Sequence, residues 1–429
     1  MEVRSGYKQT EVGFIPNDWD VKRLGNLGTV VRGGSPRPAG DPRYFNGDFI
    51  PWLTVASLTN IPEHKLFVTE TASMLTREGS LHSRTLQDGL LVIVNSGAKT
   101  LGVAKILSLT CCANDGIAAL LGQQDGEGRF LCYYLNSQTK RLREVVAAGN
   151  DQLNLNTGRI SLIAVPFPQA KEQRAIAEAL SDVDELLGGL DRLIDKKRDL
   201  KQAAMQQLLT GQTRLPGFSS KWEVKELGQL GDISGAGVDK KIRPGESPVR
   251  LLNYMDVYRR TFISAADLSH VVSASPEQAL RSAVRKGDVF FTPSSEMPFD
   301  IAASAVAVED ISDACYSYHV VRLRLDADWD LTFRGYAFRT QSFLDQAARM
   351  SEGSGVRYVI TQRKFRQLTI RYPSDRAEQA VIGGILSDMD AELAALEQRR
   401  YKTRALKQAM MQELLTGKTR LVQTEAAHA

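Results

Sequence analysis

The chain repeats one stretch of its own sequence, and this repeat limits the possible folds more than any other feature. Residues 173–215 and 379–421 align without a gap at an offset of 206 (379 − 173), with 23 of 43 positions identical. A second pair of segments, WDVKRLGNLG from Trp19 and WEVKELGQLG from Trp222, shares seven of ten positions. A repeat of this kind indicates two copies of one structural unit. The sequence therefore predicts an internal pseudo-two-fold arrangement.

The long repeated segments are predicted to be helices that pair with each other. Apolar residues recur at alternating steps of four and three, which is the a/d pattern of a coiled coil. Glycine after the last apolar residue of each run, at Gly211 and Gly417, predicts where each helix stops. A separate possibility stays open, in which each helix packs only on its own domain. The predicted seam consists of Ile176, Leu180, Val183, Leu187 and Leu190 in the first copy and Ile382, Leu386, Met389, Leu393 and Leu396 in the second.

Between the repeated segments the two halves diverge into mixtures of short strands and turn-rich loops. We therefore predict an α+β (mixed α/β) fold with two globular domains separated by a long antiparallel two-helix coiled coil. Long polar loops on such a scaffold are where recognition usually occurs. The predicted boundaries are 1–170 and 215–376 for the globular domains, 171–214 and 377–421 for the long helices, and 422–429 for a flexible tail.

Composition limits the class of protein only loosely. The net charge of +4 permits a polyanionic partner but does not require one. The four cysteines have no C-x-x-C spacing, which argues against a zinc ribbon, and scattered free cysteines suit a reducing cytoplasm. Neither a signal peptide nor an apolar run long enough to span a membrane is predicted. We expect a cytoplasmic protein without membrane contact.

Enzyme signatures are missing from the sequence. The Gly-Lys-Thr at Gly417 has Gln412 where a phosphate-binding loop needs glycine, and it ends a predicted helix instead of starting one. The Asn-Pro-Pro-aromatic motif of amino-methyltransferases does not occur, and the five histidines are scattered. The polar pairs at Asn114-Asp115 and Ser295-Glu296 are typical of turns. We therefore predict no catalytic residues and no metal site in this chain.

Basic and amide side chains in the divergent loops are the candidates for DNA contact. Arginine and lysine neutralise phosphates, and arginine and asparagine can also bind base edges. An ordinary solvated surface is the alternative interpretation of the same residues. The candidates are Arg32, Arg37, Arg43, Asn95 and Lys99 in the first half and Lys240, Lys241 and Arg243 in the second.

These features together resemble the specificity (S) subunits of type I restriction–modification systems. The opening phrase YKQTEVGFIPNDW from Tyr7 resembles the usual start of that family, and a weaker copy runs from Leu215 to Trp222. The helix phrases EQRAIAEALSDVD from Glu172 and KQAAMQQLLTG from Lys201 are also close to the family's repeated helix. The resemblance covers nearly the whole chain and is weakest in the divergent middle regions.

The resemblance implies a function in DNA recognition. In that family, two target-recognition domains each read one half of a bipartite, asymmetric site in double-stranded DNA, and the coiled coil sets the spacing. Methyltransferase subunits, expected to be two, dock on the repeated frame, and restriction subunits join them. S-adenosylmethionine, ATP and Mg are then expected in the partner subunits, and no cofactor in this chain.

Two other functions stay open from the sequence. The chain could be the recognition end of a single-chain restriction or methylation enzyme, although no segment is left over for a catalytic module. It could also be a coiled-coil scaffold that carries two unrelated ligand-binding domains. Salt-dependent DNA binding distinguishes the scaffold from a DNA-reading subunit.

Overall fold

The computed structural model describes residues 5–147, 154–235, 237–354 and 357–422, so residues 423–429 of the predicted tail lie outside the described part. The chain divides into two compact units: unit 1 is Met1–Leu193 with Glu397–Ala429, and unit 2 is Ile194–Leu396. Each unit contains one globular domain, the beginning of one long helix and the end of the other. We call the globular parts domain 1 (residues 5–169) and domain 2 (residues 215–375).

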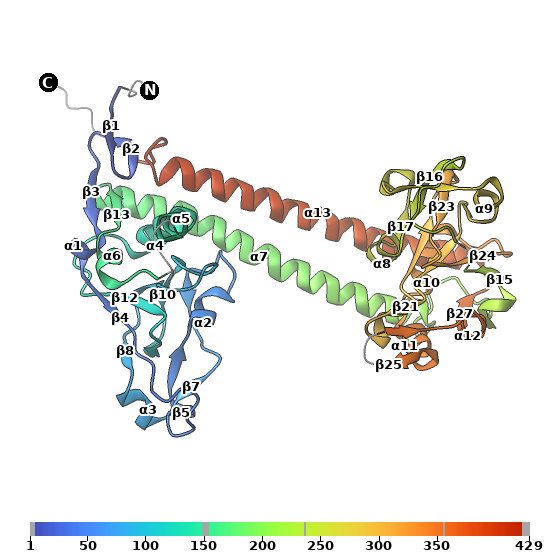
Figure 1. The fold of residues 1–429 in the computed structure, drawn as a ribbon, viewed down its shortest axis with the longest axis horizontal. Coiled ribbons are helices and arrows are strands. Elements are labelled where there is room, and N and C mark those ends of the chain that lie inside the picture. Colours follow the sequence, from blue (N-terminus) through green and yellow to red (C-terminus); the bar gives the residue numbers. More distant parts are fainter. Residues whose placement is uncertain (1–4, 148–153, 236, 355–356, 423–429) are drawn as a thin grey trace. The chain divides into compact units, whose positions relative to one another are not determined.

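Domain 1 is built on two β-sheets (Figure 1). The larger sheet has the strand order β4-β12-β9-β10-β6, and the smaller has the order β7-β5-β11-β8. The larger sheet consists of β4 (Thr29–Arg32), β6 (Phe67–Val68), β9 (Leu91–Val94), β10 (Ala104–Leu107) and β12 (Ile117–Leu121). The smaller sheet consists of β5 (Phe45–Leu53), β7 (Met74–Leu75), β8 (Arg84–Leu86) and β11 (Cys111–Ala113).

Domain 2 repeats both strand orders, although the middle regions share little sequence. Its sheets run β15-β24-β20-β22-β17 and β18-β16-β23-β19, so β4, β9 and β12 correspond to β15, β20 and β24. The predicted mixed α/β fold with an internal repeat is confirmed. The larger sheet consists of β15 (Gly231–Ser234), β17 (Phe262–Ile263), β20 (Val289–Phe291), β22 (Ser304–Ala307) and β24 (Val321–Leu325). The smaller consists of β16 (Ser247–Leu252), β18 (Val271–Ala274), β19 (Ala283–Val284) and β23 (Ile311–Tyr316).

The larger sheet is the middle layer of each domain, because its central strands are buried on both faces. All four residues of β9 are buried. Leu91 and Ile93 join the core beneath the helices, while Val92 and Val94 join the core shared with the smaller sheet. β20 alternates in the same way between two cores. Side chains of a strand point to opposite faces in turn, so one short strand can supply both cores.

A short strand pair closes each domain and leads directly into a long helix. β3 (Asp20–Arg23) pairs with β13 (Ala164–Phe167), and β14 (Trp222–Glu226) pairs with β27 (Thr369–Pro373). The long helices that follow are α7 (Ala170–Leu209) and α13 (Arg376–Leu414). The remaining helices are α1 (Leu24–Leu27), α2 (Val55–Thr59), α3 (Arg77–Leu81), α4 (Gly128–Ser137), α5 (Thr139–Ala147), α6 (Thr157–Ser161), α8 (Tyr254–Arg259), α9 (Pro276–Arg281), α10 (Leu331–Ala337), α11 (Gln341–Met350) and α12 (Gln362–Arg366). Further short strands are β1 (Tyr7–Thr10), β2 (Gly13–Pro16), β21 (Ser294–Ser295), β25 (Glu352–Ser354) and β26 (Arg357–Val359).

In unit 1 the two long helices run antiparallel and are tied to domain 1 by a buried ion pair. Lys407 of α13 lies 2.6 Å from Asp184 of α7, and both side chains are about nine-tenths buried. Tyr133 of α4 donates a hydrogen bond to the same carboxylate at 2.7 Å. A second pair, Arg400 with Asp191 at 3.0 Å, continues the antiparallel register. Burial raises the pKa of Tyr133, and its hydrogen bond to Asp184 raises it as well.

Unit 2 contains the same arrangement at the positions that the repeat relates. Lys201 of α7 forms an ion pair with Asp390 of α13, and both residues lie 206 positions from their counterparts in unit 1 (407 − 201 and 390 − 184). Tyr336 of α10 donates to Asp390 at 2.7 Å. The antiparallel helix pairing that the sequence predicted is therefore present within each unit, with the same polar tie.

A buried glutamate at the start of each long helix holds the end of the other. Glu172 is 3% exposed and accepts hydrogen bonds from Trp19 Nε1 at 3.0 Å and from Arg420 Nε at 2.6 Å. Arg420 lies just beyond α13 and also bonds Asp18. The Arg420 guanidinium lowers the pKa of the Asp18 carboxyl through this hydrogen bond. In unit 2 the equivalent set is Glu378, Trp222 and Arg214.

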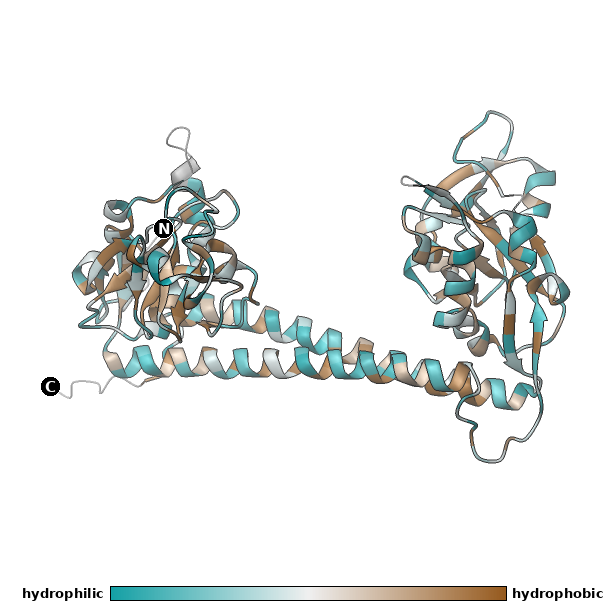
Figure 2. Cartoon of the chain, turned by 90° about the horizontal axis from the view of Figure 1, so that it is seen from below, coloured by the Kyte–Doolittle hydropathy of each residue, from teal (hydrophilic) through white to brown (hydrophobic). Residues whose placement is uncertain are grey.

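The predicted seam residues divide between two environments. Ile176 and Leu180 are fully buried in the core of domain 1, and Ile382 and Leu386 hold the equivalent places in domain 2. Leu187, Leu190 and Leu393 are buried further along the helices, while Val183, Met389 and Leu396 are partly buried. Figure 2 shows hydrophilic and hydrophobic residues alternating along both long helices. The first two seam residues of each long helix thus pack in a domain core as well as in the helix pair.

Replacing Arg420 with alanine is expected to destabilise unit 1 by about 3 kcal/mol, because Glu172 would keep its charge in a buried site with the Trp19 hydrogen bond but without a cationic partner. Urea unfolding followed by tryptophan fluorescence would measure the change, since Trp19 lies at this junction. Lys418→Ala is the matched control: Lys418 lies two residues away in an exposed ion pair with Glu413 and should change stability by less than about 0.5 kcal/mol. Equal effects of the two variants would contradict the prediction.

A chain cut after Leu215 is expected to form a homodimer. It keeps domain 1 and α7 but loses the end of α13, where Leu414 and the following Leu415 complete the domain core. A second half-chain offers an equivalent helix end, in which Arg214 takes the place of Arg420 against Glu172. Two identical halves would then be related by a true two-fold axis. Light scattering measures the oligomeric state, and a stable monomer would show that the halves are not interchangeable.

Candidate nucleic-acid interface

Three loops of domain 1 leave the larger sheet at the same end. Arg32 at the end of β4 pairs with Ala118 near the start of β12, and Val94 at the end of β9 pairs with Ile117. The end of one strand therefore lies beside the start of its antiparallel neighbour. The three loops comprise residues 33–44, 95–103 and 114–116, and they contain most of the candidate residues of the first half.

Asp115 stands at the centre of these loops. Its carboxylate accepts hydrogen bonds from Ser35 Oγ at 2.8 Å and from Arg37 Nη2 at 3.4 Å. Arg32 Nη2 lies 3.8 Å from the carboxylate, and Arg32 Nε donates to the Asp115 carbonyl oxygen at 2.6 Å. The side chains of Arg32 and Arg37 are nevertheless 55% and 73% exposed. The structure thus brings two predicted cations together around an acid that was not a predicted site residue.

The other predicted residues of domain 1 are in different positions. Asn95 is only 4% exposed and donates its side-chain amide to the Asp115 carbonyl oxygen, so it supports the loop from inside and does not form part of the exposed surface. Lys99 is exposed in the turn after β9. Arg43 forms a 2.8 Å ion pair with Asp41, and this hydrogen bond raises the pKa of Arg43 and lowers that of Asp41.

The matching end of the sheet in domain 2 carries a basic and aromatic set. Tyr318 is 50% exposed, and its ring centroid lies 3.9 Å from that of His319. Arg357 of β26 donates to Ser294 Oγ at 3.0 Å. Burial lowers the pKa of His319, and the nearby cations Lys240 and Arg357 lower it further. This end of domain 2 therefore favours an anionic ligand.

Lys241 and Arg243 lie next to the smaller sheet. The Lys241 carbonyl oxygen and the Arg243 backbone amide both bond Ser273 of β18. Arg243 also forms an ion pair with Asp239, and this hydrogen bond raises the pKa of Arg243 and lowers that of Asp239. Lys241 and Arg243 are therefore attached to the smaller sheet through Ser273, although the same segment also pairs with the loop before His319 through Val238 and Ser317. Their contact with DNA stays a prediction.

Four residues of the site were not selected from the sequence: Asp115, Tyr318, His319 and Arg357. Asp115 has the sequence signature of a turn, and nothing in its neighbourhood links it to arginines 78 or 83 residues earlier. Arg357 is likewise far from Lys240 in the sequence, so the sequence does not show that both act on His319. Only the strand order, which sets which loops share an end of the sheet, reveals the grouping.

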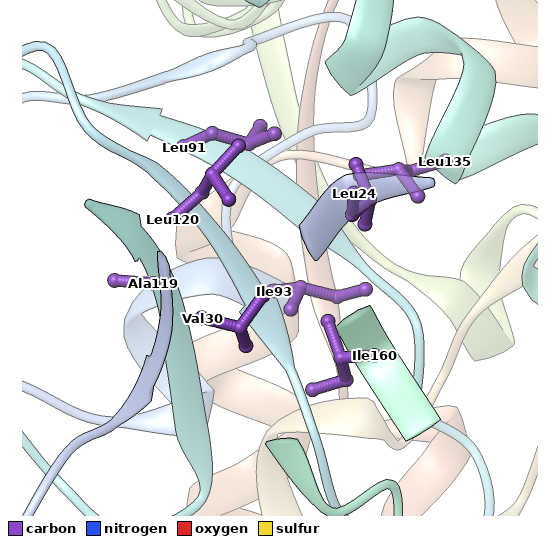
Figure 3. Close-up of a pocket in the computed structure, with 8 residues that line it drawn as sticks. All are labelled: Leu24, Val30, Leu91, Ile93, Ala119, Leu120, Leu135 and Ile160. Atoms are coloured by element: carbon purple, nitrogen blue, oxygen red, sulfur yellow. The ribbon is translucent and has the colours of Figure 1, made fainter. Parts of the chain in front are cut away.

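Domain 1 contains an apolar pocket away from these loops. Figure 3 shows an apolar pocket between the larger sheet of domain 1 and its covering helices. Among the described residues, no group of three or more His, Cys, Asp or Glu side chains could hold a metal ion. No described helix is both long and apolar enough to cross a membrane. The pocket is lined by Leu24, Val30, Leu91, Ile93, Ala119, Leu120, Leu135 and Ile160.

Sequence comparison matches both halves of the chain to one family. The family model described as "Type I restriction modification DNA specificity domain" matches residues 16–194 and again residues 219–403. The MjaIX specificity subunit of Methanocaldococcus jannaschii is 30% identical over 189 residues, which are 42% of this chain and 41% of that protein. The MjaVIII specificity subunit of the same organism is 22% identical over 95% of this chain and 94% of its own length. The chain spans about half the length of the first three relatives it matches (41%, 58% and 42%).

Structure comparison finds the same fold. The S subunit of a type I restriction–modification system from M. genitalium superposes with a TM-score of 0.54 at 13% identity, over 96% of this chain and 98% of that one. A chain from a structure of type I system assembly and conformational transition gives a TM-score of 0.60 at 15% identity, over 94% and 99% of the two chains. At these identities the likeness concerns the fold alone.

Changing Arg37, Lys99 and Lys240 together to alanine is expected to weaken binding to duplex DNA. Lys99 and Lys240 are expected to contact phosphates, so the loss of each should flatten the slope of log affinity against log salt by about one; Arg37 is expected to contact a base edge, so its loss should lower affinity without flattening this slope. Binding titrations at several salt concentrations measure this slope. The control is Lys22→Ala with Lys225→Ala, which removes cations from the strand pairs that close the domains. Binding by the triple variant that equals the wild type would exclude these residues as a group.

Proposed function

Because the chain belongs to the type I restriction–modification DNA specificity family, we propose that it is the DNA-reading subunit of a type I restriction–modification complex. Each domain reads one half of a bipartite, asymmetric target. The observation that carries this proposal is the matched pair of sheet ends, which share a strand order but carry different side chains. One scaffold with two sets of contact residues suits the recognition of two different half-sites.

The paired helices are proposed to set the spacing between half-sites and to dock two methyltransferase subunits, with restriction subunits joining the assembly. The repeat supports this, because in each unit the start of one long helix is bonded in the same way to the segment that follows the other long helix. Leucine side chains are also left exposed on the helices of unit 1, as at Leu186 (43%), Leu193 (39%) and Leu406 (56%). Exposed apolar residues on a helix suit a partner that is itself helical.

The chemistry is assigned to the partners. The sequence contains no phosphate-binding loop and no amino-methyltransferase motif, so S-adenosylmethionine, ATP and Mg are proposed to bind the methyltransferase and restriction subunits. This chain then contributes recognition and geometry without a catalytic residue. Its place of action is proposed to be the cytoplasm, where it meets DNA.

Reconstitution tests the proposal. The purified chain is expected to bind duplex DNA with an affinity that falls as salt rises, and to transfer no methyl group. With methyltransferase subunits and S-adenosylmethionine, it should direct adenine methylation to a two-part, asymmetric sequence, which methylation mapping of plasmid DNA would identify. Methyl transfer by a partner-free preparation would contradict the assignment. Absence of salt-dependent binding in the complex would instead favour a scaffold.

A further inference from the structure

The two domains carry different residues at one structurally equivalent position of the sheet end. In domain 1, Leu120 of β12 lies opposite Val30 of β4. In domain 2, Leu323 of β24 lies opposite Ile233 of β15. Both residues of the second pair are 203 positions beyond those of the first (323 − 120 and 233 − 30), which is also the offset between the repeated tryptophan segments. The same offset places residue 318 on residue 115.

A shared backbone hydrogen bond supports this equivalence. The amide of Asn114 donates to the carbonyl oxygen of Leu53, at the end of β5, at 3.0 Å. The amide of Ser317 donates to Leu252, at the end of β16, at 2.9 Å. The residues that follow Asn114 and Ser317 therefore occupy equivalent positions in the two domains. The residue at this position is an aspartate in domain 1 and a tyrosine in domain 2.

In domain 1 the carboxylate of Asp115 restrains the two exposed arginines. Its Oδ2 lies 3.4 Å from Arg37 and 3.8 Å from Arg32, and its Oδ1 accepts from Ser35. A long side chain that is already held in one conformation loses less conformational entropy when it binds its ligand. The carboxylate also repels a DNA phosphate that approaches the same guanidinium groups, whereas an uncharged base edge is not repelled.

In domain 2 no carboxylate occupies this position, because the residue is Tyr318. Lys240 and Arg357, the cations that act on the neighbouring His319, are both exposed. His319 lies in their field, and both cations lower its pKa after the larger effect of burial. Nothing at position 318 therefore opposes a phosphate, and the aromatic ring is available to stack or to pack against a sugar.

We propose that Asp115 is a positioning residue for DNA recognition in domain 1: its carboxylate holds Arg32 and Arg37 for base edges and keeps them from indiscriminate phosphate contact. The proposal rests on the proposed function, since it requires that this end of the sheet meets DNA. Sequence discrimination at the first half-site then depends on an acid that itself weakens DNA binding. Such a residue improves specificity by penalising the wrong contact.

The variant Asp115→Asn tests the proposal, because asparagine keeps the shape and the acceptor for Ser35 but removes the charge. The full chain in complex with its methyltransferase partners would be titrated with a duplex of random sequence and with the duplex it selects from a random library. Binding to the random duplex should strengthen, and its salt slope should steepen by about one to two, since each neutralised phosphate contributes about 0.9. Discrimination at the first half-site should fall roughly 5- to 150-fold, and discrimination at the second should not change.

The matched control is Asp125→Asn, which removes the same charge from domain 1 and frees Lys22 at the other end of β12. It should leave discrimination unchanged. A merely structural role for Asp115 predicts that specific and nonspecific affinity fall together, which would overturn the proposal. So would an Asp115→Asn variant that behaves like the control.

A reciprocal variant in domain 2 keeps the test independent of the folding of domain 1. Tyr318→Asp places a carboxylate at the equivalent position beside Lys240 and Arg357, and it should weaken binding to the random duplex and flatten its salt slope. Unchanged or stronger nonspecific binding by this variant would contradict the proposal. A wild-type complex that binds no DNA would instead contradict the proposed function itself. Failure of the Asp115 proposal and failure of the proposed function are therefore distinguishable.

Discussion

Each unit depends on a buried glutamate that joins three separate parts of the chain. Glu172 and Glu378 begin the long helices, and each binds a tryptophan from the start of its own domain and an arginine from beyond the end of the other helix. A buried carboxylate is tolerated only when it is paired and hydrogen-bonded. The domain, the helix that follows it and the end of the opposite helix must therefore assemble together, and neither domain is complete with its own stretch of chain alone.

The polar ties along the helices add specificity to an apolar interface. Leucine and isoleucine packing can slide by a turn with little change in buried area, whereas the Asp184–Lys407 pair and the hydroxyl of Tyr133 fit only one register. Removing one partner would strand a buried charge, so a shifted register is strongly disfavoured. The same three residue types recur in unit 2. The two units therefore share the same polar contacts between the long helices as well as the same backbone arrangement.

The proposed recognition surface varies between the domains, whereas the strand order and the helix ties are the same in both. Strand order and the two-sided burial of the larger sheet are the same in both domains, so the loops leave at equivalent places. Exposed residues on those loops, such as Arg37 and Lys99, are free to differ because they do not pack in the core, unlike Leu101. An acid among arginines in one domain and a tyrosine among cations in the other are two solutions on one scaffold.

The sequence by itself determined the duplication, the long helices, their pairing and the family, because repeats and a period of 3.5 residues are local patterns that can be counted along the chain. It also located most of the loop cations. Only the tertiary structure decided that Ile176 and Leu180 complete a domain core, that Asn95 is buried, and that Asp115 faces Arg32 and Arg37. These facts depend on which strands are neighbours, and strand order is fixed by contacts between residues far apart in the chain, which no local pattern records.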